Sequence, residues 1–263
     1  MNTSLRFRLM RERVYLIVFL NDRQQPIASG SGFWAGGHLV TNNHVFSGPA
    51  CDIVSIQSEP KPGVICFHEF KYDVFKSRLV TGSDENSHDF AVLDIPELRN
   101  LSEFQFNLVG HQNSEIGDPV AALGFPFGSE SLSIHQGWIS GYRKSGVADA
   151  IQLDMSVNQS NSGGPLVDSS GDVIGIITRK STGLTKAFDG LEESVKGNIR
   201  LIETQKKAGF QGYAVINGLD PIQSLLASQH QMLGTIFEIR RSANVGIGTA
   251  FSVDALMAEG CFA

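Results

Sequence analysis

Short apolar runs recur at close intervals along most of the chain, and turn-forming residues separate them. The runs cover residues 14–20, 39–41, 90–95, 120–123, 134–139, 151–153 and 173–177. Turn signals such as Gly36-Gly37 and Gly171-Asp172 lie between them. Many short strands joined by such turns are typical of an antiparallel sandwich or barrel. The pattern therefore predicts an all-β fold.

Residues 107–117 separate two groups of predicted strands, and we expect this stretch to link two β-subdomains. The expected division is an N-terminal extension at 1–13, a first subdomain at 14–108, a second at 109–216, and a C-terminal helix and tail at 217–263. Residues 179–209 are polar and show no strand period, which predicts a long loop or an insertion.

The tail contains the one helix that the apolar spacing predicts. The start signal Asp220-Pro221 and the apolar residues that follow it indicate a helix at residues 221–233. Its apolar side needs a partner, and Phe237, Ile239 and Phe251 resemble buried strand positions. We therefore expect the tail to pack on the second subdomain.

Composition narrows the class of protein further. The chain has 263 residues, of which 41% are hydrophobic and 18% charged, with 28 Gly and 9 Pro, so disordered and collagen-like chains are excluded. Lys and Arg number 21 against 27 Asp and Glu, a net charge of −6. An acidic chain is not expected to bind nucleic acid or an anionic membrane surface.

The cysteines and the N-terminal region bear on location. Cys51, Cys66 and Cys261 lack the spacing of a zinc site or a disulfide framework, and we interpret them as reduced thiols. No apolar run reaches the roughly 18 residues that span a bilayer. The arginines before residue 14 imitate a signal peptide, but no small-residue cleavage site follows. We expect a cytoplasmic location.

The segment Asn161-Ser162-Gly163-Gly164-Pro165 carries the strongest chemical signal. The two glycines allow a tight turn that a Cβ would block, and such a turn presents the Ser162 hydroxyl beside backbone N–H groups. Backbone donors of this kind form an oxyanion hole. A hairpin turn without chemistry has the same sequence, so the turn alone does not decide.

A serine nucleophile needs a base, and the base needs a partner that orients it. Of the seven histidines, His44 lies at the end of a predicted strand after a hairpin signal, whereas the others lie mainly in polar or turn contexts. Asp89 stands at the mouth of an apolar strand, where a buried carboxylate requires a hydrogen-bonded partner. Asp94 is the competing acid, but its position inside the strand favours the solvated face.

The order His44, Asp89, Ser162 resembles that of the chymotrypsin-like serine peptidases, and several motifs resemble the HtrA/Deg branch. These motifs are Gly30-Ser31-Gly32-Phe33, Thr41-Asn42-Asn43-His44-Val45, Asp89-Phe90-Ala91-Val92-Leu93, Asn161-Ser162-Gly163-Gly164-Pro165-Leu166 and Leu123-Gly124-Phe125-Pro126-Phe127-Gly128 with Gly137-Trp138-Ile139-Ser140. The resemblance implies two perpendicular six-stranded β-barrels with the active cleft between them. It also implies acyl transfer by a triad of nucleophile, base and acid, without cofactor or metal.

The resemblance extends to other site residues. It implies an oxyanion hole built from the backbone N–H groups of Ser160, Asn161 and Ser162. Ser156 corresponds to the base of the primary pocket, which favours small or medium uncharged side chains. Thr178 ends the strand that pairs with substrate in the family, and Arg179 and Lys180 follow it, either as contacts to acidic substrate residues or as solvated loop cations.

Three features depart from the family pattern. The chain lacks the Ile-Val-Gly-Gly start of self-activating members, and only about 50 residues follow Tyr213, so we expect no PDZ domain. Ser160 stands where the family has glycine. If the active turn needs φ > 0 there, a Cβ costs about 1 kcal/mol or more and favours a flipped peptide.

We therefore expect a serine endopeptidase that acts on protein or peptide substrates and stays latent until a substrate, oligomer or activating protein partner orders the oxyanion turn. The alternative is a protease-like scaffold that binds peptide without cutting it, which Ser160 favours. A third alternative is an esterase on the same fold. Labelling by a fluorophosphonate, compared with Ser162→Ala, separates catalysis from binding.

Overall fold

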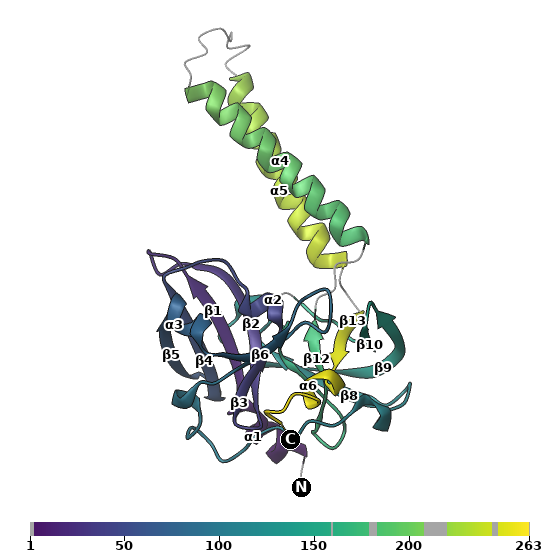
Figure 1. Cartoon of the computed structure of the whole chain (residues 1–263). Helices are drawn as coiled ribbons and strands as arrows, with labels where there is room; N and C mark the ends of the chain where they lie inside the picture. Colours follow the sequence, from purple (N-terminus) through teal and green to yellow (C-terminus); the bar gives the residue numbers. More distant parts are fainter. Residues whose placement is uncertain (1–2, 159, 179–182, 208–219, 244–246, 263) are drawn as a thin grey trace. The chain divides into compact units, whose positions relative to one another are not determined.

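A computed structural model describes residues 3–158, 160–178, 183–207, 220–243 and 247–262. The chain divides into two compact units, one formed by residues 1–179 with 246–263 and one by residues 180–245. The larger unit consists mostly of antiparallel strands (Figure 1), as the apolar pattern predicts. The smaller unit is helical.

The first half of the larger unit is a seven-stranded sheet in the order β5-β4-β1-β2-β3-β7-β6. Its strands are β1 (Val14–Leu20), β2 (Pro26–Ala35), β3 (His38–Thr41), β4 (Ile53–Lys61), β5 (Val64–Lys71), β6 (Leu79–Ser83) and β7 (Phe90–Leu93). Helices α1 (Thr3–Arg11), α2 (Asn43–Phe46) and α3 (Tyr72–Ser77) accompany them. A short 3-10 helix, η1 (Pro96–Leu98), follows β7.

The second half is a closed barrel in the order β10-β13-β12-β11-β8-β9. Its strands are β8 (Pro119–Gly124), β9 (Ser133–Ser145), β10 (Ala148–Asp154), β11 (Pro165–Val167), β12 (Val173–Thr178) and β13 (Gly248–Ser252). The 3-10 helices η2 (His111–Asn113) and η3 (Pro126–Gly128) lie before and after β8, and α6 (Asp254–Met257) follows β13.

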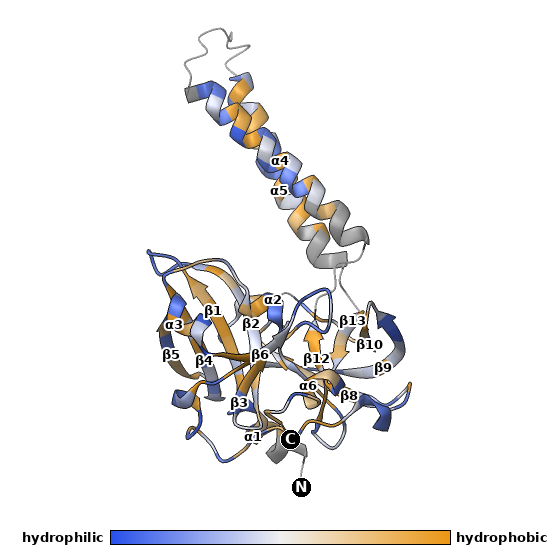
Figure 2. Ribbon diagram, in the orientation of Figure 1, coloured by the Kyte–Doolittle hydropathy of each residue, from blue (hydrophilic) through white to orange (hydrophobic). Residues whose placement is uncertain are grey.

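Strand β1 joins the two halves because both of its faces are buried. Leu16 and Val18 belong to a core cluster that also contains Leu123 of the barrel. Ile17 and Phe19 point to the other side, into a cluster within the first half. An uninterrupted apolar run is what a strand buried on both faces requires, and β1 is coloured hydrophobic along its length in Figure 2.

The segment between β12 and β13 is an insertion, one of the two alternatives that the sequence predicts, and not the long loop. Residues 183–207 form the helix α4 (Gly183–Lys207) and are not a loop. The helix predicted at 221–233 is confirmed and continues to Ala243 as α5 (Pro221–Ala243). The two helices pack side by side, and Val195 and Ile236 are buried. Phe237 and Ile239 lie exposed on α5 and are not buried strand residues.

The tail contributes a barrel strand, so the expected boundary at residue 216 differs from the structure. β13 pairs with both β10 and β12, and Phe251 is buried there as expected. Without β13 the barrel could not close. The last residues return to the first half, where Thr81 Oγ1 donates a hydrogen bond of 2.9 Å to Glu259. The helical unit is therefore an insertion between two neighbouring strands of one barrel.

Candidate active site

His44 and Asp89 come together because the end of β3 lies beside the start of its antiparallel partner β7. Thr41, the last residue of β3, pairs with Ala91 of β7. Asp89, which precedes β7, therefore lies beside the start of α2, where His44 is found. His44 Nδ1 and Asp89 Oδ2 are 2.7 Å apart. The His44 backbone N–H donates to the other carboxylate oxygen, Oδ1, at 3.0 Å. These two bonds fix both the ring and the carboxylate.

Two further side chains hold Asp89, which is only 2% exposed. Thr178 Oγ1, at the end of β12, donates to Asp89 Oδ2 at 3.2 Å. Asn42 Nδ2 donates to the Asp89 carbonyl at 2.8 Å, which secures a backbone at φ 50°. A buried carboxylate needs hydrogen-bond donors, and Thr178 and the His44 backbone N–H supply them here. The Thr178 hydroxyl therefore serves the carboxylate, a role that the sequence interpretation missed.

The loop that carries Ser162 lies between the two halves of the larger unit, and its glycines allow it to approach both of them closely. Gly163 has φ 89°, and a Cβ on it would lie 2.1 Å from the Ser31 carbonyl oxygen and 2.3 Å from Thr41 Oγ1. A Cβ on Gly164 would lie 2.2 Å from the Leu123 carbonyl oxygen. Only glycine permits approaches this close.

Backbone hydrogen bonds anchor the same loop on both sides. The Ser31 N–H of β2 donates to the Ser162 carbonyl at 2.7 Å. Gly163 N–H donates to the Ile177 carbonyl and Ile177 N–H to the Gly164 carbonyl, both at 2.8 Å. Because Ile177 precedes Thr178, the nucleophile loop and the Asp89 carboxylate are held by the same strand.

Ser162 is buried, with 5% of its surface exposed, whereas the His44 side chain is 32% exposed. No hydrogen bond joins His44 to Ser162 among the residues that the structure describes. Proton transfer from the serine to the imidazole requires that bond, and such contacts often tighten only when substrate is bound. The structure thus brings the His44–Asp89 pair and the Ser162 loop to one region without completing the contact.

The turn that precedes Ser162, which the family resemblance implies as the oxyanion hole, has a glycine-like backbone conformation at a serine. Ser160 is 4% exposed and has φ 71°, inside the left-handed region. The N–H of Asn161 donates to the Asn158 carbonyl at 3.1 Å. The family resemblance implies Asn161 as an oxyanion donor, but its N–H is engaged within the loop. The N–H groups of Ser160 and Ser162 remain as candidates.

The expected substrate contacts are only partly visible. Ser156 lies in the segment after β10 and is half-buried. Thr178 is buried with its hydroxyl on Asp89. Arg179 and Lys180 lie outside the described residues. A contact between these two cations and substrate remains a prediction.

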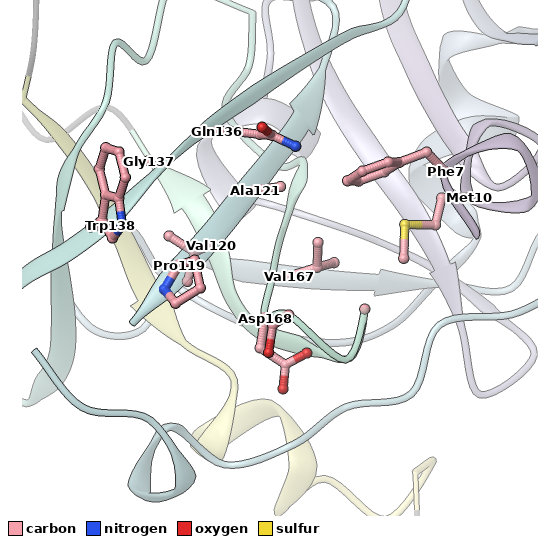
Figure 3. Close-up of a pocket in the computed structure, with 12 residues that line it drawn as sticks. Phe7, Met10, Pro119, Val120, Ala121, Gln136, Gly137, Trp138, Val167 and Asp168 are labelled. Atoms are coloured by element: carbon pink, nitrogen blue, oxygen red, sulfur yellow. The ribbon is translucent and has the colours of Figure 1, made fainter. Parts of the chain in front are cut away.

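A separate cavity of about 400 Å³ lies between α1 and the barrel (Figure 3). Phe7 and Met10 of α1 line one side, and Pro119, Trp138 and Asp168 belong to the opposite wall. None of its lining residues belongs to the candidate triad, so the cavity has no part in the triad's chemistry. Within the described part of the chain, no group of three or more His, Cys, Asp or Glu residues could hold a metal ion.

The chain belongs to the family of the trypsin-like peptidase domain, which it matches over residues 29–176. It is 35% identical over 162 residues to a probable periplasmic serine endoprotease, DegP-like, of Bartonella henselae, covering 59% of this chain and 29% of that protein. It is 34% identical over 176 residues to Protease Do-like 5, chloroplastic, of Arabidopsis thaliana, covering 61% of this chain and 52% of that protein.

Among solved structures, the HtrA-type protease AlgWS227A with tripeptide is 28% identical, with a TM-score of 0.53, covering 70% of this chain and 56% of that one. The expected chymotrypsin-like fold and the HtrA/Deg resemblance are confirmed. One detail differs, because the first half is a seven-stranded sheet and not the six-stranded barrel that the resemblance implies. The chain spans about half or less of the length of these two curated relatives from Bartonella and Arabidopsis.

The relatives also correct one expectation. The cytoplasmic location expected from the sequence is wrong, since the names of these relatives place them in the periplasm or the chloroplast. In the described part of the chain, no helix has both the length and the apolar character to cross a membrane.

Proposed function

We propose that this chain is a serine endopeptidase that cleaves protein or peptide substrates through an acyl-enzyme. The observation that carries the proposal is the His44–Asp89 pair, with a 2.7 Å contact at Nδ1, beside a glycine-shaped loop that carries a serine. The relatives named as serine endoproteases support the same activity. The tripeptide bound to the related HtrA-type protease supports a peptide as the substrate class.

Each residue then has a defined part in the reaction. Ser162 Oγ attacks the substrate carbonyl carbon while His44 Nε2 accepts its proton. Asp89 holds the proton on Nδ1 and stabilises the imidazolium that forms, since its Oδ2 faces that nitrogen. The imidazolium then donates the proton to the leaving amine. Water later attacks the acyl group with His44 again acting as base, and Ser162 is released.

We also propose that the resting enzyme is slow, because serine, and not glycine, occupies the left-handed position of its oxyanion turn. An L-residue in the left-handed region costs about 1 kcal/mol or more relative to glycine. One missing oxyanion donor lowers turnover by about 10²- to 10³-fold. A substrate, oligomer or activating partner that binds the ordered turn would supply the difference. Ser160→Gly is therefore expected to raise basal turnover.

The test of the activity is covalent labelling by a fluorophosphonate together with hydrolysis of an unfolded protein such as casein. The native chain should be labelled and should cleave casein, and Ser162→Ala should do neither. If the native chain binds peptide but is labelled no faster than Ser162→Ala, it is a protease-like binding protein, the candidate that Ser160 favours. Hydrolysis of an activated ester without any cleavage of casein would instead indicate the esterase.

A further inference from the structure

The serine at position 160 has a partner on the opposite half of the larger unit. Ser160 Oγ and Ser29 Oγ, the latter from β2, are 2.7 Å apart and share a hydrogen bond. A glycine at position 160 could not form this contact. The side chain that makes the turn costly thus also makes a bond that the family's glycine cannot make.

A second bond from the same strand acts on the backbone of that residue. Ser31 Oγ donates to the Ser160 carbonyl at 2.6 Å, and Ser31 is fully buried. The Ser31 hydroxyl also accepts a hydrogen bond of 3.1 Å from the Phe125 N–H. Because Ser29 and Ser31 are two residues apart on one strand, their side chains point to the same side. β2 therefore contacts Ser160 at two points, its hydroxyl and its carbonyl.

We propose that Ser29 is a positioning residue for the oxyanion turn. Its hydroxyl favours Ser160 at φ 71°, so the hydrogen bond between the two serines offsets part of the conformational cost that glycine would avoid. The proposal rests on the proposed peptidase activity and deepens it, since it names what opposes the cost of Ser160. Its hydroxyl is bonded to Ser160, and in this proposal Ser29 acts on the reaction through Ser160.

The geometry also explains why the hydrogen bond has an effect on the turn and not on stability alone. Ser160 is buried, so a hydroxyl that loses its partner cannot turn to water without moving the residue. A typical hydrogen bond shifts an equilibrium by about 2- to 10-fold. The population of the turn with φ > 0 should fall by that factor when Ser29 loses its hydroxyl.

The test is a double-mutant cycle of Ser29→Ala and Ser160→Gly in the full chain, measured by kcat on a peptide and by the rate of fluorophosphonate labelling. With Ser160 present, Ser29→Ala should lower both rates by about 2- to 10-fold at unchanged KM. With glycine at position 160, Ser29→Ala should change them by less than about 1.5-fold, since glycine has no hydroxyl to hold. Ser160→Ala should resemble Ser29→Ala, and Ser29→Thr should restore the native rate.

Thermal unfolding of the same variants gives a measure that does not depend on turnover. Ser29→Ala should lower Tm by about 2–4 °C with Ser160 and by clearly less with glycine. Equal losses of rate and Tm in both backgrounds would overturn the role of Ser29 while leaving the peptidase intact. A native chain that is labelled no faster than Ser162→Ala would overturn the proposed activity, and the Tm cycle would then still decide whether Ser29 holds the turn.

Discussion

Replacing Asp89 by asparagine tests the proposed mechanism most directly, because the hydrogen bonds determine which way the new amide must face. The His44 backbone N–H donates to Oδ1 at 3.0 Å, so an acceptor is required there. The Thr178 hydroxyl at Oδ2 can rotate and accept a hydrogen bond, whereas the backbone N–H can only donate. The amide oxygen therefore takes the place of Oδ1, and the NH₂ group takes the place of Oδ2. That group then faces His44 Nδ1, which the native carboxylate oxygen approaches to 2.7 Å.

The substitution changes the tautomer of the imidazole. A nitrogen that faces an NH₂ donor must itself be the acceptor, so the proton of neutral His44 moves from Nδ1 to Nε2. Nε2 then has no lone pair to accept the proton of Ser162. The substitution also removes the negative charge that stabilises the imidazolium.

The expected loss can be assembled from two parts. A carboxylate and an imidazolium with charge centres about 4 Å apart, at an effective dielectric constant of about 20, attract by about 4 kcal/mol, or roughly 10³-fold in rate. Asp89 is 2% exposed, so solvent screens little of this attraction. The wrong tautomer lowers the rate further, because Nε2 cannot accept the serine proton. We expect kcat of Asp89→Asn to fall by about 10⁴-fold, the size of effect that such a change produces in a serine triad.

The assay is kcat for peptide hydrolysis, with the fluorophosphonate labelling rate as a second measure and thermal unfolding as the check of folding. Asp94→Asn is the matched control, since Asp94 follows β7 at its other end, is partly exposed and forms an ion pair with Arg99. It should leave kcat unchanged. A folded Asp89→Asn protein that keeps a tenth or more of native kcat would refute the triad assignment.

Three further predictions concern other parts of the structure. Thr178→Val removes one donor from the buried Asp89 carboxylate and should lower kcat by about 10- to 100-fold at constant KM, and an unchanged kcat would exclude this role. Replacing residues 180–245 by a short glycine-rich loop should leave the barrel folded, with Tm within about 3 °C of the native value, because Thr178 pairs directly with Thr249. Truncation after Val215 removes β13 and should lower Tm by about 10 °C or more. A truncated chain as stable as the native one would contradict the role of β13. Burial raises the pKa of Glu59, but the N–H groups of Gly63 and Leu132 and the Arg11 guanidinium outweigh it and hold the pKa below 4.5. Glu59 therefore stabilises the fold above about pH 4.5 and loses this effect as the pH falls through its lowered pKa. Glu59→Gln should lower the free energy of unfolding by about 1–3 kcal/mol at pH 7 and by progressively less as the pH falls below 4.5. A loss that does not shrink with falling pH would show that the charge is not involved.

The sequence alone predicts the parts of this protein that local constraints encode. Glycine is required wherever one backbone approaches another this closely. Gly163 and Gly164 therefore mark the turn after Ser162 in the sequence itself. Apolar runs such as residues 14–20 indicate buried strands because strand burial repeats along the chain. His44 and Asp89 stand next to such strands. This placement, together with the order His44, Asp89, Ser162 along the chain, indicates them as the other two members of the candidate triad.

Other features are decided by contacts between segments that are distant in the sequence. Arg13 belongs to the group of N-terminal arginines, and the sequence does not indicate that it is only 2% exposed and donates to the carbonyls of Leu98 and Phe104. The hydroxyls of Thr178 and Ser29 have no local pattern that would reveal their partners on other strands. The polar residues of helix α4 predict a loop or an insertion and not a helix, but a helix that packs on one partner needs only a narrow apolar stripe.

Strand β13 shows most clearly that pairing between distant segments cannot be predicted from local sequence. A five-residue strand at Gly248–Ser252 is a weak pattern by itself, and it closes the barrel only because β10 and β12 lie on either side of it. Its pairing partners lie far away along the chain, β12 on the other side of the inserted helical unit and β10 further still. Local sequence therefore determines which residues can react, and the tertiary structure decides which hydroxyls hold them in place and which strand completes the barrel beneath them.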